Sequence, residues 1–208
     1  MFDLDGTLAD TLDDIAAAGN YMLRELGREP VETQRYRYLA GQGAEWLVRE
    51  ALQTEDPAAI EQGLNLFRQH YHEHRHALTR PYPGIPEMLD ALVERGITLT
   101  VLSNKPHPFT QQVVREKFSR WPFAIVHGAK PDVPLKPDPA AARAIVDEAG
   151  IAPEHWLYVG DTSVDMKTAN GAGLFAVGVT WGFRTEEELR QHGAKAIVHH
   201  PGEITAMV

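Results

Sequence analysis

Two aspartates separated by a single residue stand near the start of the chain, in the stretch Phe2-Asp3-Leu4-Asp5-Gly6-Thr7-Leu8. On an extended backbone, residues at i and i+2 point to the same side, so these two carboxylates lie together. Carboxylates this close repel each other and call for a cation or a shared proton. An Asp-Gly pair between apolar residues also favours a β-hairpin. The capping-type and acidic residues that follow predict a helix, however, and favour a ligand-binding strand end.

Three later stretches place polar side chains next to apolar runs. They are Ser103-Asn104-Lys105, Leu135-Lys136-Pro137-Asp138-Pro139 and Gly160-Asp161-Thr162-Ser163-Val164-Asp165. Taken singly, each has an ordinary structural explanation, such as a helix cap, a turn or a solvated surface lysine. Their combination in one chain, each beside a predicted strand, favours a shared site.

The combined groups suit phosphoryl transfer, in which a protein mainly positions the reactants and stabilises charge. Mg²⁺ takes oxygen ligands, for which Asp3 and Asp161 are the natural candidates, with Asp165 one helical turn after Asp161. A hydroxyl and an ammonium group can hold phosphoryl oxygens. One carboxylate can act as a nucleophile, and a second carboxyl can protonate the leaving group and later activate water.

The elements that must position these groups alternate between strand and helix in the second half of the chain. Apolar runs predict strands at 97–102, 123–126, 156–159, 175–179 and 196–198, after a first strand at 1–4. Helices are predicted between them, at 85–94, 108–118, 139–149, 164–172 and 186–191. This alternation predicts an α/β fold with a doubly wound, mostly parallel sheet that binds ligands at the carboxyl ends of its strands.

The stretch from about residue 11 to residue 76 contains no convincing strand. Helices are predicted from Thr11 to a C-cap at Gly27 and at 44–52 and 58–76, before prolines and a glycine break the pattern at 80–84. We therefore expect a catalytic core formed by 1–12 and 82–208, with a helical cap, 13–81, inserted after the first strand. Because a strand at 1–4 is short for a central sheet position, the true N-terminus stays open.

The four motifs resemble those of the haloacid dehalogenase-like hydrolases, and the resemblance covers the whole chain. Three further stretches are most similar to phosphoglycolate phosphatases of that superfamily: Leu39-Ala40-Gly41-Gln42-Gly43-Ala44, Ser103-Asn104-Lys105-Pro106 and Val179-Thr180-Trp181-Gly182-Phe183. The resemblance implies a two-part hydrolase whose helical cap closes over the core. It implies hydrolysis of a small phosphorylated metabolite through a phospho-aspartate intermediate.

The resemblance also implies roles for individual residues. Asp3 would be the nucleophile and Asp5 the acid/base, while Ser103 and Lys136 would hold the phosphoryl group. Mg²⁺ would be bound by Asp3, the main-chain carbonyl of Asp5, Asp161 and Asp165. We expect Asn104 and Lys105 to contact substrate as well.

Substrate choice must come from the cap, because the catalytic loops meet only the phosphoryl group. Gly41, Gln42 and Gly43 precede a predicted helix, whose free N–H groups and dipole favour an anion. The alternative is that these glycines only form a turn. We expect them to bind the carboxylate of 2-phosphoglycolate or of a similar small acid phosphate.

Other functions remain open from the residues alone. Within the superfamily, a sugar phosphomutase or phosphotransferase and a pyrophosphatase are close alternatives, whereas a carbon–halogen hydrolase typically lacks the second aspartate of the first motif. An alternative from another class is a phospho-acceptor signalling domain, which also combines an aspartate cluster, a hydroxyl and a lysine on a parallel sheet. It would be shorter and would have no helical insert.

Composition narrows the partners further. The chain has 208 residues and a net charge of −9, so we expect no nucleic-acid partner. It contains no cysteine, which excludes thiol chemistry and fits a cytoplasmic protein. No apolar run is long enough to span a membrane. We expect a monomer or a homodimer.

Four alternating histidines, His70, His72, His74 and His76, form a second cluster of possible ligands. On a helix, His70/His74 and His72/His76 are i, i+4 pairs that could each bind a transition metal. We interpret them as the solvated end of a helix.

Overall fold

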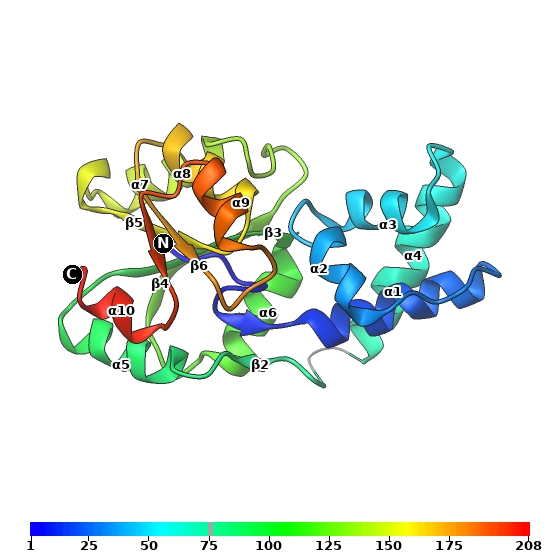
Figure 1. Ribbon diagram of the computed structural model, residues 1–208, viewed down its shortest axis with the longest axis horizontal. Coiled ribbons are helices and arrows are strands. Elements are labelled where there is room, and N and C mark those ends of the chain that lie inside the picture. The colour runs from blue at the N-terminus through cyan, green and yellow to red at the C-terminus, as the bar shows by residue number, and fades with distance from the viewer. Residues whose placement is uncertain (75–76) are drawn as a thin grey trace.

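The structure, a computed structural model, describes residues 1–74 and 77–208. Figure 1 shows a sheet enclosed by helices on one side of the molecule and a group of helices on the other. The first segment of the chain lies inside the sheet, and the chain then passes into the separate group of helices before it returns. The part of the molecule that contains the sheet is therefore built from segments that lie far apart in the chain.

The sheet is parallel and is centred on the first three residues. Its labelled strands are β3 (Leu99–Pro106), β4 (Phe123–Ala129), β5 (Leu157–Gly160), β6 (Phe175–Val179) and β7 (Ala196–Val198). Strand β3 pairs with β4, β5 pairs with β6, and β6 pairs with β7, all in parallel. Phe2 joins the two halves, because it bridges Val101 of β3 on one side and Val159 of β5 on the other.

This arrangement puts Asp3 at the point where the strand order changes direction. The Asp3 N–H donates to the Val159 carbonyl at 2.9 Å, while the Leu102 N–H donates to the Phe2 carbonyl at 2.9 Å. Successive strands run outward from residues 1–3 toward β4 on one side and toward β7 on the other. Crevices at such switch points are where open α/β sheets bind their ligands.

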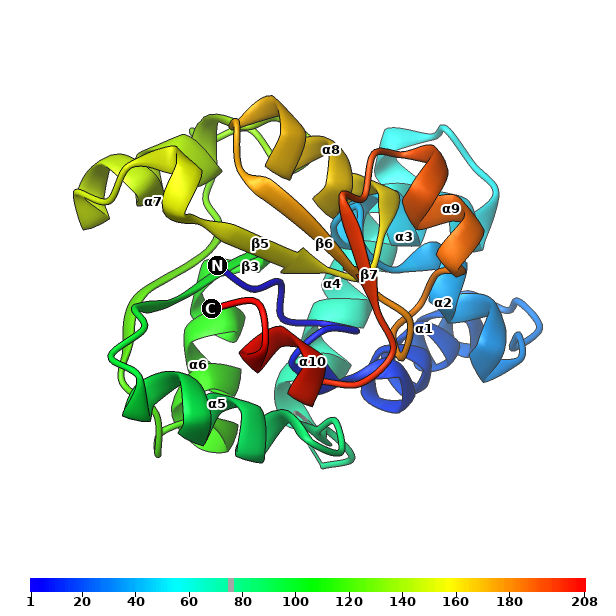
Figure 2. The same cartoon turned by 60° about the vertical axis from the view of Figure 1, so that its left-hand side comes forward.

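Helices cover both faces of the sheet because its strands alternate two sets of apolar side chains. Val101, Val159 and Val177 point to one face and pack against α5 (Ile85–Glu94), α6 (His107–Lys117) and α10 (Gly202–Thr205). Leu102, Tyr158 and Ala176 point to the other and pack against α7 (Ala140–Ala149), α8 (Ser163–Gly171) and α9 (Glu186–Gln191). Figure 2 shows these two helical layers below and above the sheet.

The separate group of helices, here called the helical cap, has its own apolar core. It consists of α1 (Leu12–Glu25), a 3₁₀ turn (Thr33–Arg35), α2 (Tyr36–Leu39), α3 (Ala44–Leu52) and α4 (Pro57–Glu73). Leu23, Tyr36, Val48 and Phe67 are buried together between these helices. The cap leaves and rejoins the core through two short antiparallel strands, β1 (Ala9–Asp10) and β2 (Arg80–Pro81).

The α/β class and the parallel sheet predicted from the sequence are confirmed. The exceptions lie where apolar patterning is weak. The first strand is reduced to the Phe2 bridges, and the chain after Asp5 makes a tight turn, with the Gly6 N–H donating to the Ala9 carbonyl at 2.9 Å, before the first helix. In the expected return linker, 80–84, Arg80 and Pro81 pair with β1 as strand β2. Helix α4 ends at Glu73, and residues 75–76 lie outside the described part of the chain. The division of core and cap at 13 and 81 stays a prediction.

Within residues 1–74 and 77–208, none of the helices combines the length and the apolar character that crossing a membrane requires.

Candidate active site

Three aspartates meet at the carboxyl edge of the sheet. Asp3 follows the central Phe2 bridge, Asp161 follows β5, and Asp165 lies one turn into α8. One carboxylate oxygen from each lies within 4.8 Å of the others, and all three residues are buried. In the described residues this is the one group of three or more acidic or histidine side chains with ligand atoms in such reach. It unites residues that the sequence placed in separate motifs.

Lys136 compensates part of this negative charge. Its ammonium group lies 2.9 Å from Oδ1 of Asp3 and 2.7 Å from Oδ1 of Asp165. It also donates to the Leu102 carbonyl at 3.2 Å, so all three ammonium hydrogens have acceptors. The Lys136 side chain is 2% exposed. A lysine read from sequence as possibly solvated is therefore the buried counter-ion of the cluster.

Burial and mutual repulsion shift the pKa values of these carboxyls. Burial raises the pKa of Asp3 well above its usual range, the Asp165 carboxylate adds to that rise, and Lys136 opposes it. Burial and Asp165 raise the pKa of Asp161 to about 7, against hydrogen bonds from Phe183 and Thr7. Burial alone would lower the pKa of Lys136, but Asp165 and Asp3 raise it well above its usual range. The cluster has more negative charge than one lysine neutralises.

The protein holds these carboxylates in fixed positions. Asp161 accepts from the Thr7 hydroxyl at 3.0 Å and from the Phe183 N–H at 2.7 Å. Asp165 and Thr162 form a capping box at the start of α8, in which each side chain bonds the other's backbone N–H. Gly6 has φ +85°, and a Cβ there would lie 2.2 Å from an Asp161 oxygen, so glycine is needed for this close approach.

Asp5 stands apart from the cluster and faces the cap. Its two carboxylate oxygens lie 2.8 and 2.9 Å from the ammonium of Lys105. Burial alone would lower the pKa of Lys105, but the Asp5 carboxylate raises it above its usual range. Ser103, two residues earlier on β3, is buried and lines the same pocket as Asp3. The expected acid/base and hydroxyl groups thus share one site with Asp3, while Lys105 pairs with Asp5.

A pocket that is open to solvent extends from these residues to the cap. Its floor contains Asp3, Asp5, Ser103 and Lys105. Its walls are mostly apolar and come from cap and core: Ile15, Ala40, Gly41, Gly43, Ala44, Leu47, Phe67, Arg68, Tyr71, Asn104, Pro106 and Phe109. A polar floor with apolar walls is typical of a site for a small organic ligand.

The cap loop meets the sequence prediction in part. Gly41 and Gly43 line the pocket, and α3 begins at Ala44, so the N-terminus of this helix faces the ligand space. Gln42 is exposed and is absent from the pocket wall, so the structure does not support its expected substrate contact.

The side chain of Asn104 is occupied by backbone contacts. Its amide nitrogen donates to the carbonyls of Gly41 and Lys136 at 3.0 and 2.9 Å, and its oxygen accepts from the Lys136 N–H at 2.8 Å. These bonds tie the end of β3 to the lysine segment and to the cap loop. Asn104 therefore has a structural role, and because it also lines the pocket, its expected substrate contact stays a prediction.

Sequence reasoning missed several residues of the pocket wall. Arg68 and Tyr71 come from α4, and Phe109 comes from the first turn of α6. Arg68 is four residues after Leu64 and three before Tyr71, two buried residues of the same helix. Residues three or four apart share one side of a helix. The spacing of Arg68 from Leu64 and Tyr71 could therefore have indicated that this cation lies on the apolar face of the helix.

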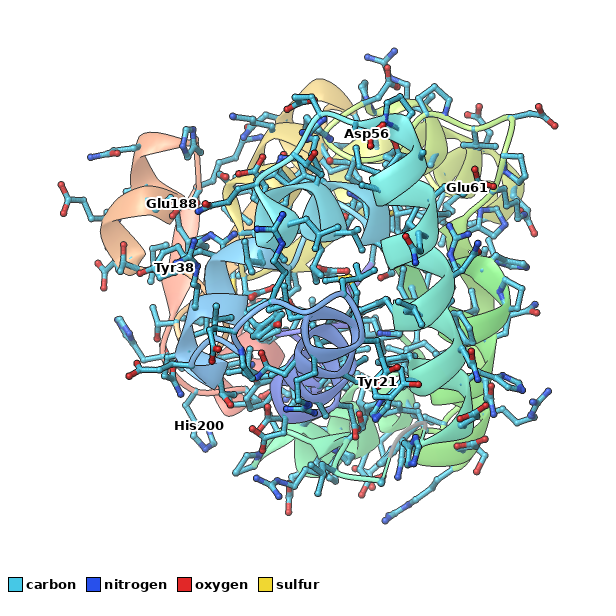
Figure 3. All side chains as sticks on the ribbon, turned by 90° about the vertical axis from the view of Figure 1, so that its right-hand side faces the viewer. Tyr21, Tyr38, Asp56, Glu61, Glu188 and His200 are labelled. Carbon is cyan, nitrogen blue, oxygen red and sulfur yellow. The ribbon has the colours of Figure 1, made fainter. Side chains whose placement is uncertain are left out.

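Two arginines fasten the cap to the core beside the aspartate cluster. Arg37 of α2 donates to the carbonyls of Gly182 and Phe183, the residue whose N–H holds Asp161. In return, Arg184 donates to the carbonyls of Arg37, Tyr38 and Ala40. The Arg184 guanidinium also lies 5.2 Å from the Tyr38 ring and 3.4 Å from Glu188. Figure 3 shows Tyr38 and Glu188 on the same side of the molecule.

The histidine cluster shows packing between rings. The rings of His70 and His74 stack at 4.3 Å, and His70 also lies 4.6 Å from Tyr21 of α1. In the described part of the chain, these histidines belong to no group of three candidate metal ligands. The pair His72/His76 is only partly covered, because residue 76 lies outside the described residues.

Known proteins are similar to this chain in sequence and in fold. A chain from Pseudomonas putida named phosphoglycolate phosphatase is 40% identical over 193 residues, covering 88% of this chain and 69% of the relative. "Phosphoglycolate phosphatase 1" of Pseudomonas aeruginosa is 35% identical and covers 95% of this chain and 75% of its own length. A crystal structure from Lactobacillus delbrueckii subsp. bulgaricus, assigned provisionally to the phosphoglycolate phosphatases by its name, superposes with a TM-score of 0.93. It has 28% identity and covers 99% of this chain and 95% of that one.

The family model for haloacid dehalogenase-like hydrolases matches residues 1–179. That match includes the three clustered aspartates, Lys136 and the whole helical cap. The chain is a member of the haloacid dehalogenase-like hydrolases.

Proposed function

We propose that this phosphatase hydrolyses a small acid phosphomonoester, with 2-phosphoglycolate as the first candidate, through a phosphoryl group carried on Asp3. The observation that carries the proposal is the buried cluster of Asp3, Asp161, Asp165 and Lys136, whose member Asp3 lines a pocket between core and cap. The names of the relatives supply the candidate substrate. Asp3 is the member of the cluster that lines the pocket, which supports its assignment as nucleophile.

The proposed reaction has two displacements. An Asp3 oxygen forms a bond to phosphorus while the bond from phosphorus to the leaving oxygen breaks, and Asp5 gives that oxygen a proton. Asp5 then takes a proton from water as the water oxygen attacks phosphorus and the bond to Asp3 breaks. Asp3 Oδ1 is held by the Leu4 N–H at 2.7 Å and by Lys136, so Oδ2 is the oxygen that accepts no hydrogen bond from the described residues.

The cluster fits Mg²⁺. Its donors are hard carboxylate oxygens, which Mg²⁺ prefers, and the three carboxylates outnumber the one lysine beside them. Asp3, Asp161 and Asp165 would hold the ion, and the Asp5 carbonyl is a further candidate. When bound, Mg²⁺ supplies positive charge to the oxygens of the transferring phosphoryl group.

Binding of Mg²⁺ is expected to stabilise the fold more at pH 7.5 than at pH 5. Folding raises the pKa of Asp161 from an ordinary value of 3.8 to about 7, so the folded protein holds a proton that the unfolded chain releases. Metal-free stability therefore falls as pH rises from about 4 to about 7. At 100 times its Kd, Mg²⁺ adds about 2.7 kcal/mol. This corresponds to roughly 5–10 °C in Tm for a chain of this size.

The measurement is a thermal unfolding series in chelator and in Mg²⁺ at both pH values. Asp161→Asn is the matched variant: it should raise the metal-free Tm at pH 7.5 and remove most of the response to Mg²⁺. Equal Mg²⁺ shifts at the two pH values, in both proteins, would contradict a site built on Asp161.

The cap supports a substrate with a second negative charge. Arg68 is a cationic residue in a largely apolar wall, and the N-terminus of the nine-residue helix α3 adds its N–H groups and dipole. Gly43 is a poor site for testing this, because its φ is +94° and a side chain there would strain the loop. Arg68 can be changed without that strain, since it is exposed on a regular helix.

Replacing Arg68 by glutamine is expected to lower kcat/KM for 2-phosphoglycolate by roughly 10- to 150-fold, the effect of losing a charge-assisted hydrogen bond worth about 1.5–3 kcal/mol. Hydrolysis of 4-nitrophenyl phosphate, which has no carboxylate, should change little. The measurement is phosphate release with Mg²⁺ over a panel of small phosphorylated metabolites. Arg115→Gln, an exposed arginine of α6 outside the pocket wall, is the control.

The outcomes separate substrate from chemistry. If the wild-type protein hydrolyses 2-phosphoglycolate no better than the aryl ester, the substrate is wrong and the phosphatase chemistry stands. If no ester on the panel releases phosphate with turnover, the proposed reaction fails. Phosphoryl return to a sugar acceptor would favour the mutase alternative.

The expectations about partners, oligomeric state and location stay predictions. A phospho-acceptor signalling domain would have no helical insert, and the helices from α1 to α4 argue against it. The absence of nucleic-acid partners, a monomeric or dimeric state and a cytoplasmic location follow from composition and resemblance alone.

A further inference from the structure

Lys105 and Asp5 form an ion pair on the side of the core that faces the cap. The ammonium of Lys105 lies 2.8 Å from one oxygen of Asp5 and 2.9 Å from the other. The two side chains are 6% and 15% exposed, respectively. Because one ammonium engages both oxygens, the plane of the carboxylate is set by the position of the lysine.

The backbone of Lys105 is anchored on the core. Its N–H donates to the Ser103 hydroxyl at 3.2 Å, and its carbonyl accepts from the Thr110 hydroxyl at 3.0 Å. These contacts join the end of β3 to the first turn of α6. The Lys105 side chain therefore reaches Asp5 from a backbone whose N–H and carbonyl are both hydrogen-bonded.

The cap covers the pair with an aromatic side chain. Tyr71 of α4 is buried, and its ring centroid lies 4.8 Å from the Lys105 ammonium. Phe109 packs edge-on against the same ring at 5.7 Å. An ammonium over an aromatic face is attracted by the ring, and the attraction grows when water is excluded. The contact between Tyr71 and Lys105 therefore links the ion pair to the position of the cap on the core.

We propose that Lys105 is a positioning residue, which orients the Asp5 carboxylate for the attack of water on phospho-Asp3 and does not itself hold the phosphoryl group. This inference rests on the proposed function, because it takes Asp3 as nucleophile and Asp5 as acid/base. It assigns Lys105 a different role from the substrate contact expected from sequence. Two of its three ammonium hydrogens are engaged by Asp5.

The two roles have opposite kinetic signatures with 4-nitrophenyl phosphate. Its good leaving group needs little help from an acid, so kcat/KM reports the formation of phospho-Asp3. Loss of Asp5 alignment slows only the second displacement, so kcat and KM fall together and phosphoenzyme accumulates. Loss of a phosphoryl contact raises KM, lowers kcat/KM and leaves no accumulated intermediate.

Lys105→Met is expected to lower kcat for 4-nitrophenyl phosphate by roughly 100-fold, the scale of misplacing a catalytic group by about 1 Å. KM should fall in parallel, and kcat/KM should stay within about threefold of wild type, because bond formation at Asp3 is unaffected. Stopped-flow recording should show a burst of nitrophenolate close to one equivalent per active site. Lys105→Arg, which keeps a cation near Asp5, should recover most of kcat and lose the burst.

Three results would overturn the proposal: a raised KM with kcat/KM reduced as much as kcat, no burst in Lys105→Met, or the same kinetics in both lysine variants. Lys167→Met, an exposed lysine of α8, controls for the loss of one positive charge. Thermal unfolding of each variant identifies a folding defect, and Lys105→Gln is the substitute if Lys105→Met does not fold. Failure of the wild-type protein to release nitrophenolate would instead remove the proposed function.

Discussion

Asp3→Asn is expected to lower kcat by on the order of 10⁶, as loss of a covalent nucleophile does in serine hydrolases. An amide oxygen is a poor nucleophile and a weaker ligand for a cation than a carboxylate. No neighbouring carboxylate can replace Asp3 as nucleophile. Asp161 and Asp165 are outside the pocket lining and are held by Thr7, Phe183 and the capping box. The loss should appear equally with the natural substrate and with an aryl phosphate.

This substitution should leave the fold intact. Burial and Asp165 make the ionised form of Asp3 unfavourable, so a neutral amide of the same shape relieves repulsion. The asparagine oxygen can still accept from the Leu4 N–H and from Lys136, the partners of Asp3 Oδ1. We therefore expect a metal-free Tm equal to or above that of the wild type, together with a smaller response to Mg²⁺.

The measurement is single- and multiple-turnover phosphate release, with mass spectrometry to detect deamidation back to aspartate. Near-normal turnover from protein that carries intact asparagine would refute Asp3 as the nucleophile. A loss of activity accompanied by a large drop in Tm would point to a structural effect and contradict the relief of repulsion.

Lys136→Met is expected to lower kcat/KM by about 10³ or more and to destabilise the metal-free protein. Removing one preorganised donor from a developing charge costs about 10²–10³ in rate. The Lys136 ammonium also holds Asp3 in the cluster, because its nitrogen lies 2.9 Å from Asp3 Oδ1. Leaving buried charges without their partner costs roughly 3–5 kcal/mol. Mg²⁺ should recover part of this stability, because it neutralises the same carboxylates.

A double variant separates the two effects. If Lys136 stabilises the fold by compensating Asp3, then Asp3→Asn should restore much of the Tm lost in Lys136→Met, and the two changes should not be additive. Activity should stay absent in the double variant. Full additivity of the two Tm changes, measured by thermal unfolding in chelator, would show that Lys136 stabilises the protein in some other way.

Much of the fold follows from local pattern. The bounds of α5, β6, α9 and β7 agree with the prediction. Strands β6 and β7 are short apolar segments, helix α5 begins after Gly84, and helix α9 begins after the capping residue Thr185. Strand alternation also places apolar residues on both faces of the sheet, which requires two helical layers. The cluster of carboxylates was predictable for the same reason: strand ends in a parallel sheet meet at one edge.

The sequence by itself therefore determined the α/β class, the family resemblance and the approach of Asp3, Asp161, Asp165 and Lys136. The tertiary structure alone decided how individual side chains are used. In the folded protein, Lys105 pairs with Asp5, which lies 100 positions away in the sequence. The Asn104 amide bonds to backbone groups, and Arg68 and Tyr71 of the cap line the pocket. Periodicity reports which side of an element a residue occupies, whereas the partner it meets depends on how distant elements pack, and no local pattern encodes that packing.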